Sequence, residues 1–184
     1  MKKGYNENIA GAIEAFLTND DWHFRFDDEM GIFSFGVALS GKLRNVRFAI
    51  HVRDDDYIVY ATSPVRPDHM DDEMMAAMAE LVCRMNFGIV NGNFELDFTD
   101  GELRYKSFED CDGGLVPTRE IVKNSIIITA SMLDRYSPCI LALLFEDASA
   151  KDAYERHLSA ADLLSRARSR HPTGSSEEAS PPTR

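Results

Sequence analysis

The sequence has few of the features that mark a disulfide-bonded, zinc-binding or membrane-spanning protein. Its three cysteines, Cys83, Cys111 and Cys139, are 28 residues apart and form no Cys-x-x-Cys pair, so neither a disulfide framework nor a zinc site is expected. The longest apolar run, 139–145, is far shorter than the roughly 20 residues that span a bilayer. Two lysines near the start precede no apolar segment, which argues against a secretory signal. We therefore expect reduced thiols, a cytoplasmic location and no membrane partner.

Basic residues are also scarce. The 184 residues include 20 Lys and Arg against 31 Asp and Glu, a formal net charge of −11. Binding to phosphates needs a basic face, so this balance argues against nucleic acid as a partner. The hydrophobic fraction of 44% is that of a globular chain, and a chain of this length buries roughly 70% of its unfolded surface without a metal or a disulfide.

No group of residues has the spacing of a catalytic or cofactor site. The five histidines are scattered, with no His-x-x-x-His pair and no nucleophile motif beside them. Gly113-Gly114 is not followed by the Lys-Ser/Thr of a phosphate loop. Asp110-Cys111-Asp112 lacks the later glutamate of a calcium loop. The sequence therefore predicts a protein that is not an enzyme and has no catalytic residues, cofactor or metal.

The first half of the chain predicts a helix followed by three strands. Helical spacing covers 8–18, and alternation of apolar residues covers 31–40 and 46–52. A two-residue type II′ turn at Gly41-Lys42 joins these two strands and predicts the pairs Val37–Val46, Phe35–Phe48 and Phe33–Ile50. The other, polar face is then lined by Asn45, Arg47, His51 and Arg53. The third strand, 57–61, has an open register, since either Tyr57 and Val59 or Ile58 and Tyr60 can face inward.

A methionine-rich helix follows. Asp68 is the expected N-cap of a helix that runs to about Phe87, and the acidic triplet 71–73 complements its positive end. One apolar stripe contains Met70, Met74, Met78, Leu81, Val82 and Met85. The stripe favours core packing, while Met70 and Met75 fall toward its edge, where thioethers suit a surface that accepts varied apolar partners.

Two further strands and two helices complete the predicted fold. A type I′ turn at Asp100-Gly101 predicts the pairs Phe98–Leu103, Leu96–Tyr105, Asp97–Arg104 and Glu95–Lys106. A helix over 117–136 should break or kink near Tyr136, because Pro138 follows. A more polar helix reaches about residue 168, and the Ser- and Pro-rich segment 169–184 is expected to be disordered.

The order helix, three strands, helix, two strands, helices predicts an α+β domain over 1–168 with an antiparallel sheet of about five strands. This order and four segments resemble the YbjN-like family over roughly 8–146. The segments are LVCRMN at 81–86, GNFELD at 92–97, DGELRY at 100–105 and DRYSP at 134–138. The resemblance implies a fold similar to type III secretion chaperones, a homodimer and a role as a bacterial sensory transduction regulator. It implies no catalytic residues.

The candidate partner-binding residues are apolar. The apolar sector of the helix at 117–136 is wider than one sheet face needs, so part of it is a candidate subunit interface. Together with the methionine helix it gives the set Met70, Met74, Met75, Met78, Ile128, Met132 and Tyr136. The predicted function is a dimeric protein-binding regulator or chaperone-like protein whose apolar grooves take a basic or amphipathic partner. The alternative is a regulatory domain that senses a small ligand.

Overall fold

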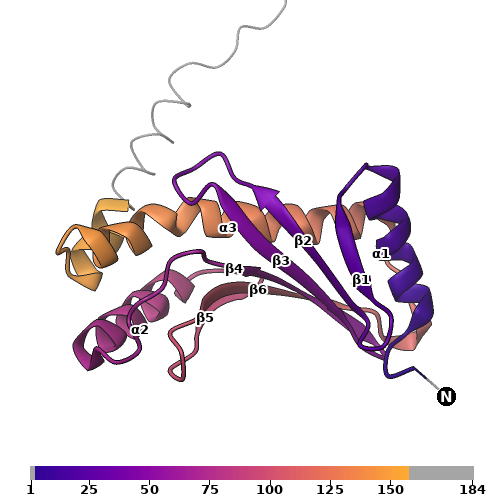
Figure 1. Ribbon diagram of the computed structural model, residues 1–184, viewed down its shortest axis with the longest axis horizontal. Helices are drawn as coiled ribbons and strands as arrows, with labels where there is room; N and C mark the ends of the chain where they lie inside the picture. The colour runs from indigo at the N-terminus through magenta and orange to yellow at the C-terminus, as the bar shows by residue number, and fades with distance from the viewer. Residues whose placement is uncertain (1–2, 158–184) are drawn as a thin grey trace, which may run out of the picture.

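The computed structural model describes residues 3–157, which form an α+β fold around one six-stranded antiparallel sheet (Figure 1). The strand order is β1-β2-β3-β4-β6-β5. The helices are α1 (Glu7–Asn19), α2 (Asp72–Asn86) and α3 (Arg119–Phe145), and 150–157 are also helical. The strands are β1 (Phe24–Asp27), β2 (Ile32–Ala38), β3 (Asn45–Val52), β4 (Asp56–Thr62), β5 (Asn93–Leu96) and β6 (Leu103–Asp110).

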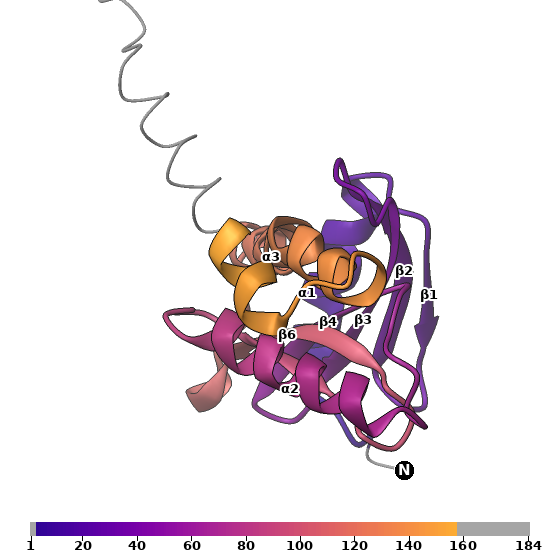
Figure 2. The same ribbon diagram turned by 90° about the vertical axis from the view of Figure 1, so that its left-hand side faces the viewer.

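All three helices gather on one side of the sheet (Figure 2). The long helix α3 packs against β4 and β6, α2 packs against β5 and α3, and α1 packs against α3. Burial alternates along β3, where Val46, Phe48 and Ile50 are buried and Arg47 is exposed. The opposite face of the sheet is therefore uncovered in the described part of the chain.

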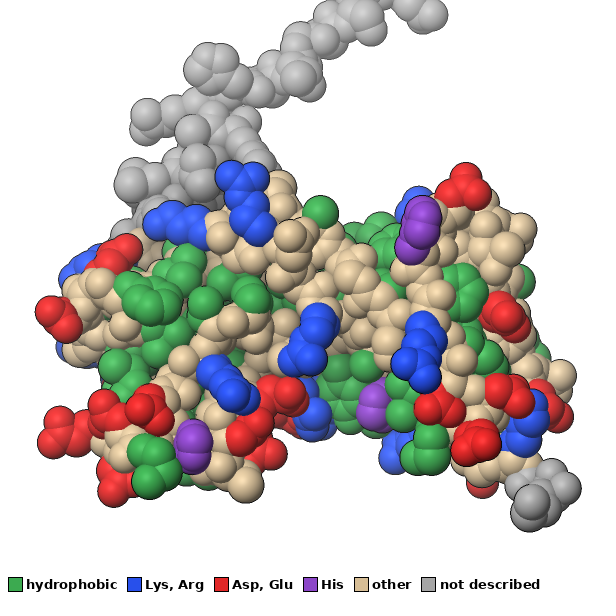
Figure 3. Space-filling model, in the orientation of Figure 1, with side chains coloured by type: hydrophobic (Ala, Val, Ile, Leu, Met, Phe, Trp, Pro, Cys, Tyr) green, Lys and Arg blue, Asp and Glu red, His purple; other side chains and the backbone are tan. Residues whose placement is uncertain are grey.

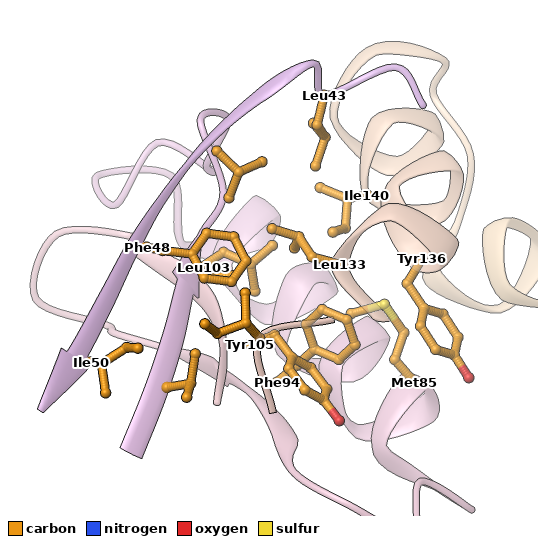
Figure 4. Close-up of a cluster of buried hydrophobic side chains, with 14 of the residues drawn as sticks. Leu43, Phe48, Ile50, Met85, Phe94, Leu103, Tyr105, Leu133, Tyr136 and Ile140 are labelled. Atoms are coloured by element: carbon orange, nitrogen blue, oxygen red, sulfur yellow. The ribbon is translucent and has the colours of Figure 1, made fainter. Parts of the chain in front are cut away.

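The centre of the core lies where α2 and α3 meet the sheet (Figure 4). Phe94 of β5 makes edge-on contacts with Tyr105 of β6 and Tyr136 of α3, with ring centroids 5.0 and 5.5 Å apart. Met85 of α2 and Leu133 of α3 are fully buried in the same cluster. Apolar residues from four different elements thus share one interior, as a single folding unit requires.

The predicted β2–β3 pairing is confirmed, but the turn between these strands is not type II′. Val37, Phe35 and Phe33 pair with the expected partners. Gly41 does not have a positive φ, whereas Arg44 does, at 57°. The side chain of Asp134 on α3 accepts hydrogen bonds from the Gly41 N–H and the Ser40 hydroxyl, both at 3.0 Å. A Cβ at Gly41 would overlap this carboxylate, so contact with α3, rather than local turn preference, sets the loop.

The structure resolves the register that the sequence left open for β4. Tyr57, Val59 and Ala61 are fully buried, and Ile58 and Tyr60 point to the uncovered face. The Tyr57 hydroxyl lies 3.3 Å from the Ser125 hydroxyl on α3. Because the Tyr57 hydroxyl has this partner, the Tyr57 ring can occupy the interior without an unsatisfied polar group.

The predicted β5–β6 pairing is wrong by two residues. Leu96 pairs with Leu103 and Phe94 with Tyr105, so Phe98 lies in the loop and is exposed. The Asp97 side chain accepts the Thr99 N–H at 2.7 Å, and Gly101 takes a φ of +78°. A four-residue loop thereby replaces the type I′ turn. A shift of two residues keeps every side chain on its predicted face.

The start of α2 and the number of strands also differ from expectation. The N-cap of α2 is Asp71, whose side chain accepts the Met74 N–H at 2.9 Å. Asp68 instead accepts the Met70 N–H in the turn before the helix. Strand β1 was not predicted, although Phe24 and Phe26 alternate with charged residues; at four residues it gives too short a pattern to stand out. The sheet therefore has one strand more than expected.

Helix α3 does not end near Tyr136 but continues through Pro138 to Phe145. Proline has no N–H, so the carbonyl of Asp134 loses its usual intrahelical partner. The Ser137 hydroxyl donates to this carbonyl at 2.8 Å. Ser137 is buried, and its bond replaces the missing one, so the expected break does not occur.

This replacement bond gives a testable prediction. Ser137→Ala should destabilise the protein by about 1–2 kcal/mol relative to Ser131→Ala, because it leaves the partly buried carbonyl of Asp134 without a partner. Ser131 lies on the exposed side of the same helix and controls for the higher helix propensity of alanine. Chemical denaturation of both variants measures the difference. Equal stability would show that Ser137 does not compensate for Pro138.

The C-terminal predictions fall partly beyond the described residues. Residues 150–157 are helical as expected, but the predicted end of that helix near 168 and the expected disordered segment 169–184 lie outside the described range. Helix α3 is long and apolar enough to cross a membrane by length and hydropathy alone. Half of its most apolar window is buried in the protein, so the helix is only weak evidence for a membrane span.

Candidate functional site on the uncovered sheet face

The uncovered face of the sheet contains a hollow of about 530 Å³. It lies over β2, β3, β4 and β6, and we call it the sheet-face hollow. Its floor consists of small residues, because Gly36 and Ala49 place at most a methyl group there. Larger polar side chains surround this floor. The full lining is Ser34, Phe35, Gly36, Arg47, Phe48, Ala49, His51, Tyr60, Thr62, Glu102 and Arg104.

Strand register brings two arginines to opposite sides of one threonine. Arg47 of β3 pairs with Thr62 of β4, which pairs in turn with Arg104 of β6. Adjacent strands lie about 4.8 Å apart, so the two arginine backbones are separated by roughly 10 Å. The short Thr62 side chain leaves the space between the two long side chains open.

Arg104 is held in place by three neighbours. Its Nε donates to Glu95 at 2.9 Å, and its Nη1 lies 3.4 Å from Glu102. Its guanidinium carbon sits 4.3 Å from the centroid of the Tyr60 ring, a cation–π distance. These contacts fix the direction of the guanidinium and leave Nη2 without a hydrogen-bond partner among residues 3–157.

Glu95 is the acidic centre of this network. Burial by itself would raise the pKa of its carboxyl, but bonds from Lys106 and Arg104 hold that pKa below its usual value. The predicted Glu95–Lys106 ion pair therefore exists despite the shifted register. The predicted Asp97–Arg104 ion pair is not formed, because Arg104 pairs with Glu95 and Glu102 instead.

His51 forms one side of the hollow. Its ring meets the Tyr60 ring edge-on, with centroids 5.0 Å apart. Burial, together with the positive charge of Arg104, lowers the pKa of His51 below its usual value. The imidazole is therefore neutral at pH 7 and offers one donor and one acceptor nitrogen.

The lowered pKa of His51 predicts a pH dependence of stability. The folded state resists protonation of this ring, so its contribution is complete above pH 6.5 and is lost as the pH falls through the lower folded pKa. His51→Gln should flatten the loss of stability between pH 7 and pH 5. His157, whose pKa burial also lowers, will leave a residual slope. Urea unfolding at several pH values measures both slopes; an unchanged slope in the variant would contradict the assignment.

The structure separates the seven sequence-predicted binding residues into three groups. Met70 is 78% exposed. Met74, Ile128 and Met132 are half-buried. Met75, Met78 and Tyr136 are buried, with Met75 only 3% exposed. The expectation that Met75 lies at the edge of the stripe is thus wrong, and it is Met74 that lies there.

The outer face of α3 carries further apolar residues. Ile121 and Ile127 are 42% and 47% exposed, and Ile128 and Met132 continue this surface partly buried. We call these four residues the α3 outer face. The wide apolar sector read from the sequence therefore does reach the surface of the subunit, although Tyr136 does not.

The buried Met75 of α2 and the exposed Met70 just before this helix give a paired prediction. Met75→Glu should cost about 3 kcal/mol or more of folding free energy, because it buries a carboxylate without a partner. Met70→Glu should change stability by less than about 0.5 kcal/mol, since its side chain is solvated. Thermal and urea unfolding compare the two. Similar costs would place both side chains in the same environment, against the structure.

The remaining chemical groups do not converge on the hollow. Burial raises the pKa of the Cys139 thiol to about 12 and also raises that of Cys111, whereas Cys83 is exposed. Within residues 3–157 no three His, Cys, Asp or Glu side chains are grouped as metal ligands would be.

Sequence reasoning placed Arg47 and His51 on the polar face of a strand but did not bring Arg104 and Tyr60 to them. The signal that could have done so is the pairing of β4 with β6, which are separated by α2 and β5. Opposite charges on the two strands do not reveal it, because Arg104 is paired within its own hairpin. Long-range strand pairing therefore creates the site.

Comparison with known proteins adds no assignment to this geometry. The chain matches no model of a protein family. No curated protein matches it either.

Proposed function

We propose that the protein is a non-enzymatic regulator that works by binding, and that the sheet-face hollow is its binding site. The single observation that carries this proposal is the uncovered sheet face, where side chains with free hydrogen-bonding groups surround a floor of small residues. A concave surface with a few convergent polar groups is the usual form of a small-molecule site. The proposal corresponds to a cytoplasmic, small-ligand-sensing regulatory domain.

The second candidate function is binding of a partner protein, and the α3 outer face favours it. Exposed isoleucines on a core helix suit either a second copy in a homodimer or the apolar side of a partner helix. The negative net charge of the chain would favour a basic or amphipathic partner. Under this proposal the fold is used as in the type III secretion chaperones, and the resemblance to the YbjN-like family supports it.

Two single substitutions distinguish the candidates. Ala49→Trp fills the sheet-face hollow from its floor, and Ile127→Glu places a charge on the α3 outer face. Both side chains lie outside the fully buried core. We expect native mass spectrometry of protein from the native host to show a bound small molecule that Ala49→Trp removes and Ile127→Glu retains.

The opposite pattern would favour the second candidate. Loss of a bound protein, or conversion of a dimer to a monomer in light scattering, with Ile127→Glu alone would assign function to the α3 outer face. If neither variant changes what the protein binds or its mass in solution, both surfaces are excluded.

A further inference from the structure

The sheet-face hollow offers more hydrogen-bond donors than acceptors. In the described part of the chain, the Arg47 guanidinium has no carboxylate or hydrogen-bond partner, and the hydroxyls of Ser34 and Thr62 also have none. The Tyr60 hydroxyl is likewise without a hydrogen-bond partner there. The single carboxylate in the lining, Glu102, already faces Arg104. A ligand that complements this surface must therefore supply acceptors.

The charge around the hollow contrasts with that of the whole chain. Register places Arg25, Arg47, Arg104 and Lys106 on the uncovered face in two neighbouring rows, against the acidic Glu95 and Glu102. Several basic side chains lie across the middle of the molecule, with acidic side chains beside them and toward both ends (Figure 3). A locally positive surface on a protein of charge −11 attracts anions to this one region.

We infer that the sheet-face hollow binds a small organic acid, whose oxyanion group lies above Thr62 between the guanidinium groups of Arg47 and Arg104. This inference rests on the proposed function and specifies its ligand. Arg104 is oriented beforehand by Glu95 and Tyr60, while Arg47 is free to close on the anion. Guanidinium groups bind carboxylate and phosphate oxygens with two parallel hydrogen bonds, which gives both strength and direction.

The rest of the ligand lies over the floor of the hollow. Gly36 and Ala49 leave room there, and the Tyr60 and His51 rings stand beside it. The volume of about 530 Å³ is within the range of roughly 300–1,000 Å³ found for small-molecule sites. The site therefore suits an acid that carries a ring or a short apolar group.

Titrations with model acids test the inference. Benzoate and phenyl phosphate are added to the full chain at constant ionic strength, with benzamide as the neutral control, and binding is followed by backbone amide NMR. We expect both acids, but not benzamide, to shift the amides around Arg47 and Thr62. The tighter of the two identifies the natural oxyanion as carboxylate or phosphate.

Matched arginine variants test the geometry. Arg47→Gln should weaken binding of the acids roughly tenfold or more, because it removes a charge-assisted bond. Arg25→Gln removes the same charge from an exposed position on the same face, outside the lining, and should weaken binding less than twofold. Both side chains lack ion pairs among residues 3–157, so the melting temperatures should match the wild type.

Three results would overturn the inference. These are equal losses of affinity for the acids in the two variants, binding of benzamide as tight as that of the acids, or, in a parallel titration, binding of a thymidine oligonucleotide that is tighter than that of the acids and shifts the same amides. The proposed function can survive such a result. If neither acid binds but Ala49→Trp still removes the native ligand, the hollow remains the binding site and only the ligand class is wrong.

Discussion

The packing of α3 against β4 and β6 is the contact on which the rest of the structure depends. Its buried side chains cover the middle of the sheet, and α1 and α2 both pack against α3 rather than against each other. Polar side chains at this contact are paired, as in the 2.9 Å bond between Ser107 and Thr129. Because the same helix also holds the β2–β3 loop through Asp134, it fixes the position of every strand that forms the hollow.

A single helical layer has a direct consequence for function. An antiparallel sheet tolerates water on one face, and here that face combines a floor of small residues with arginine, tyrosine and histidine around it. The electrostatics follow from this arrangement. Many acidic residues lie in turns and at helix starts, where they cap backbone N–H groups. In the two rows of strand residues that border the hollow, Arg25, Arg47, Arg104 and Lys106 face a single acid, Glu95.

Two errors in sequence reasoning came from side-chain contacts that apolar periodicity does not show. The residues Asp100-Gly101 are typical of a two-residue hairpin turn. In the observed register, however, Phe94 packs between Tyr105 and Tyr136, and this apolar site is better than the one that Phe98 would have in the predicted register. Helix α3 continues through Pro138, and the Ser137 hydroxyl bonds to the carbonyl that proline leaves without an N–H partner. Apolar periodicity reveals neither the aromatic neighbours of Phe94 nor this local bond.

The sequence alone determined the class of the fold, the faces of β2, β3, β5 and β6 and the positions of most helices, because apolar periodicity depends only on which side of an element is buried. It also placed Arg47 and His51 on a polar face. Only the tertiary structure decided that β4 lies beside β6, that Met75 is interior, and that Arg47 and Arg104 stand on either side of Thr62. Those facts depend on pairing between strands distant in sequence, and periodicity within one segment carries no information about its distant neighbours.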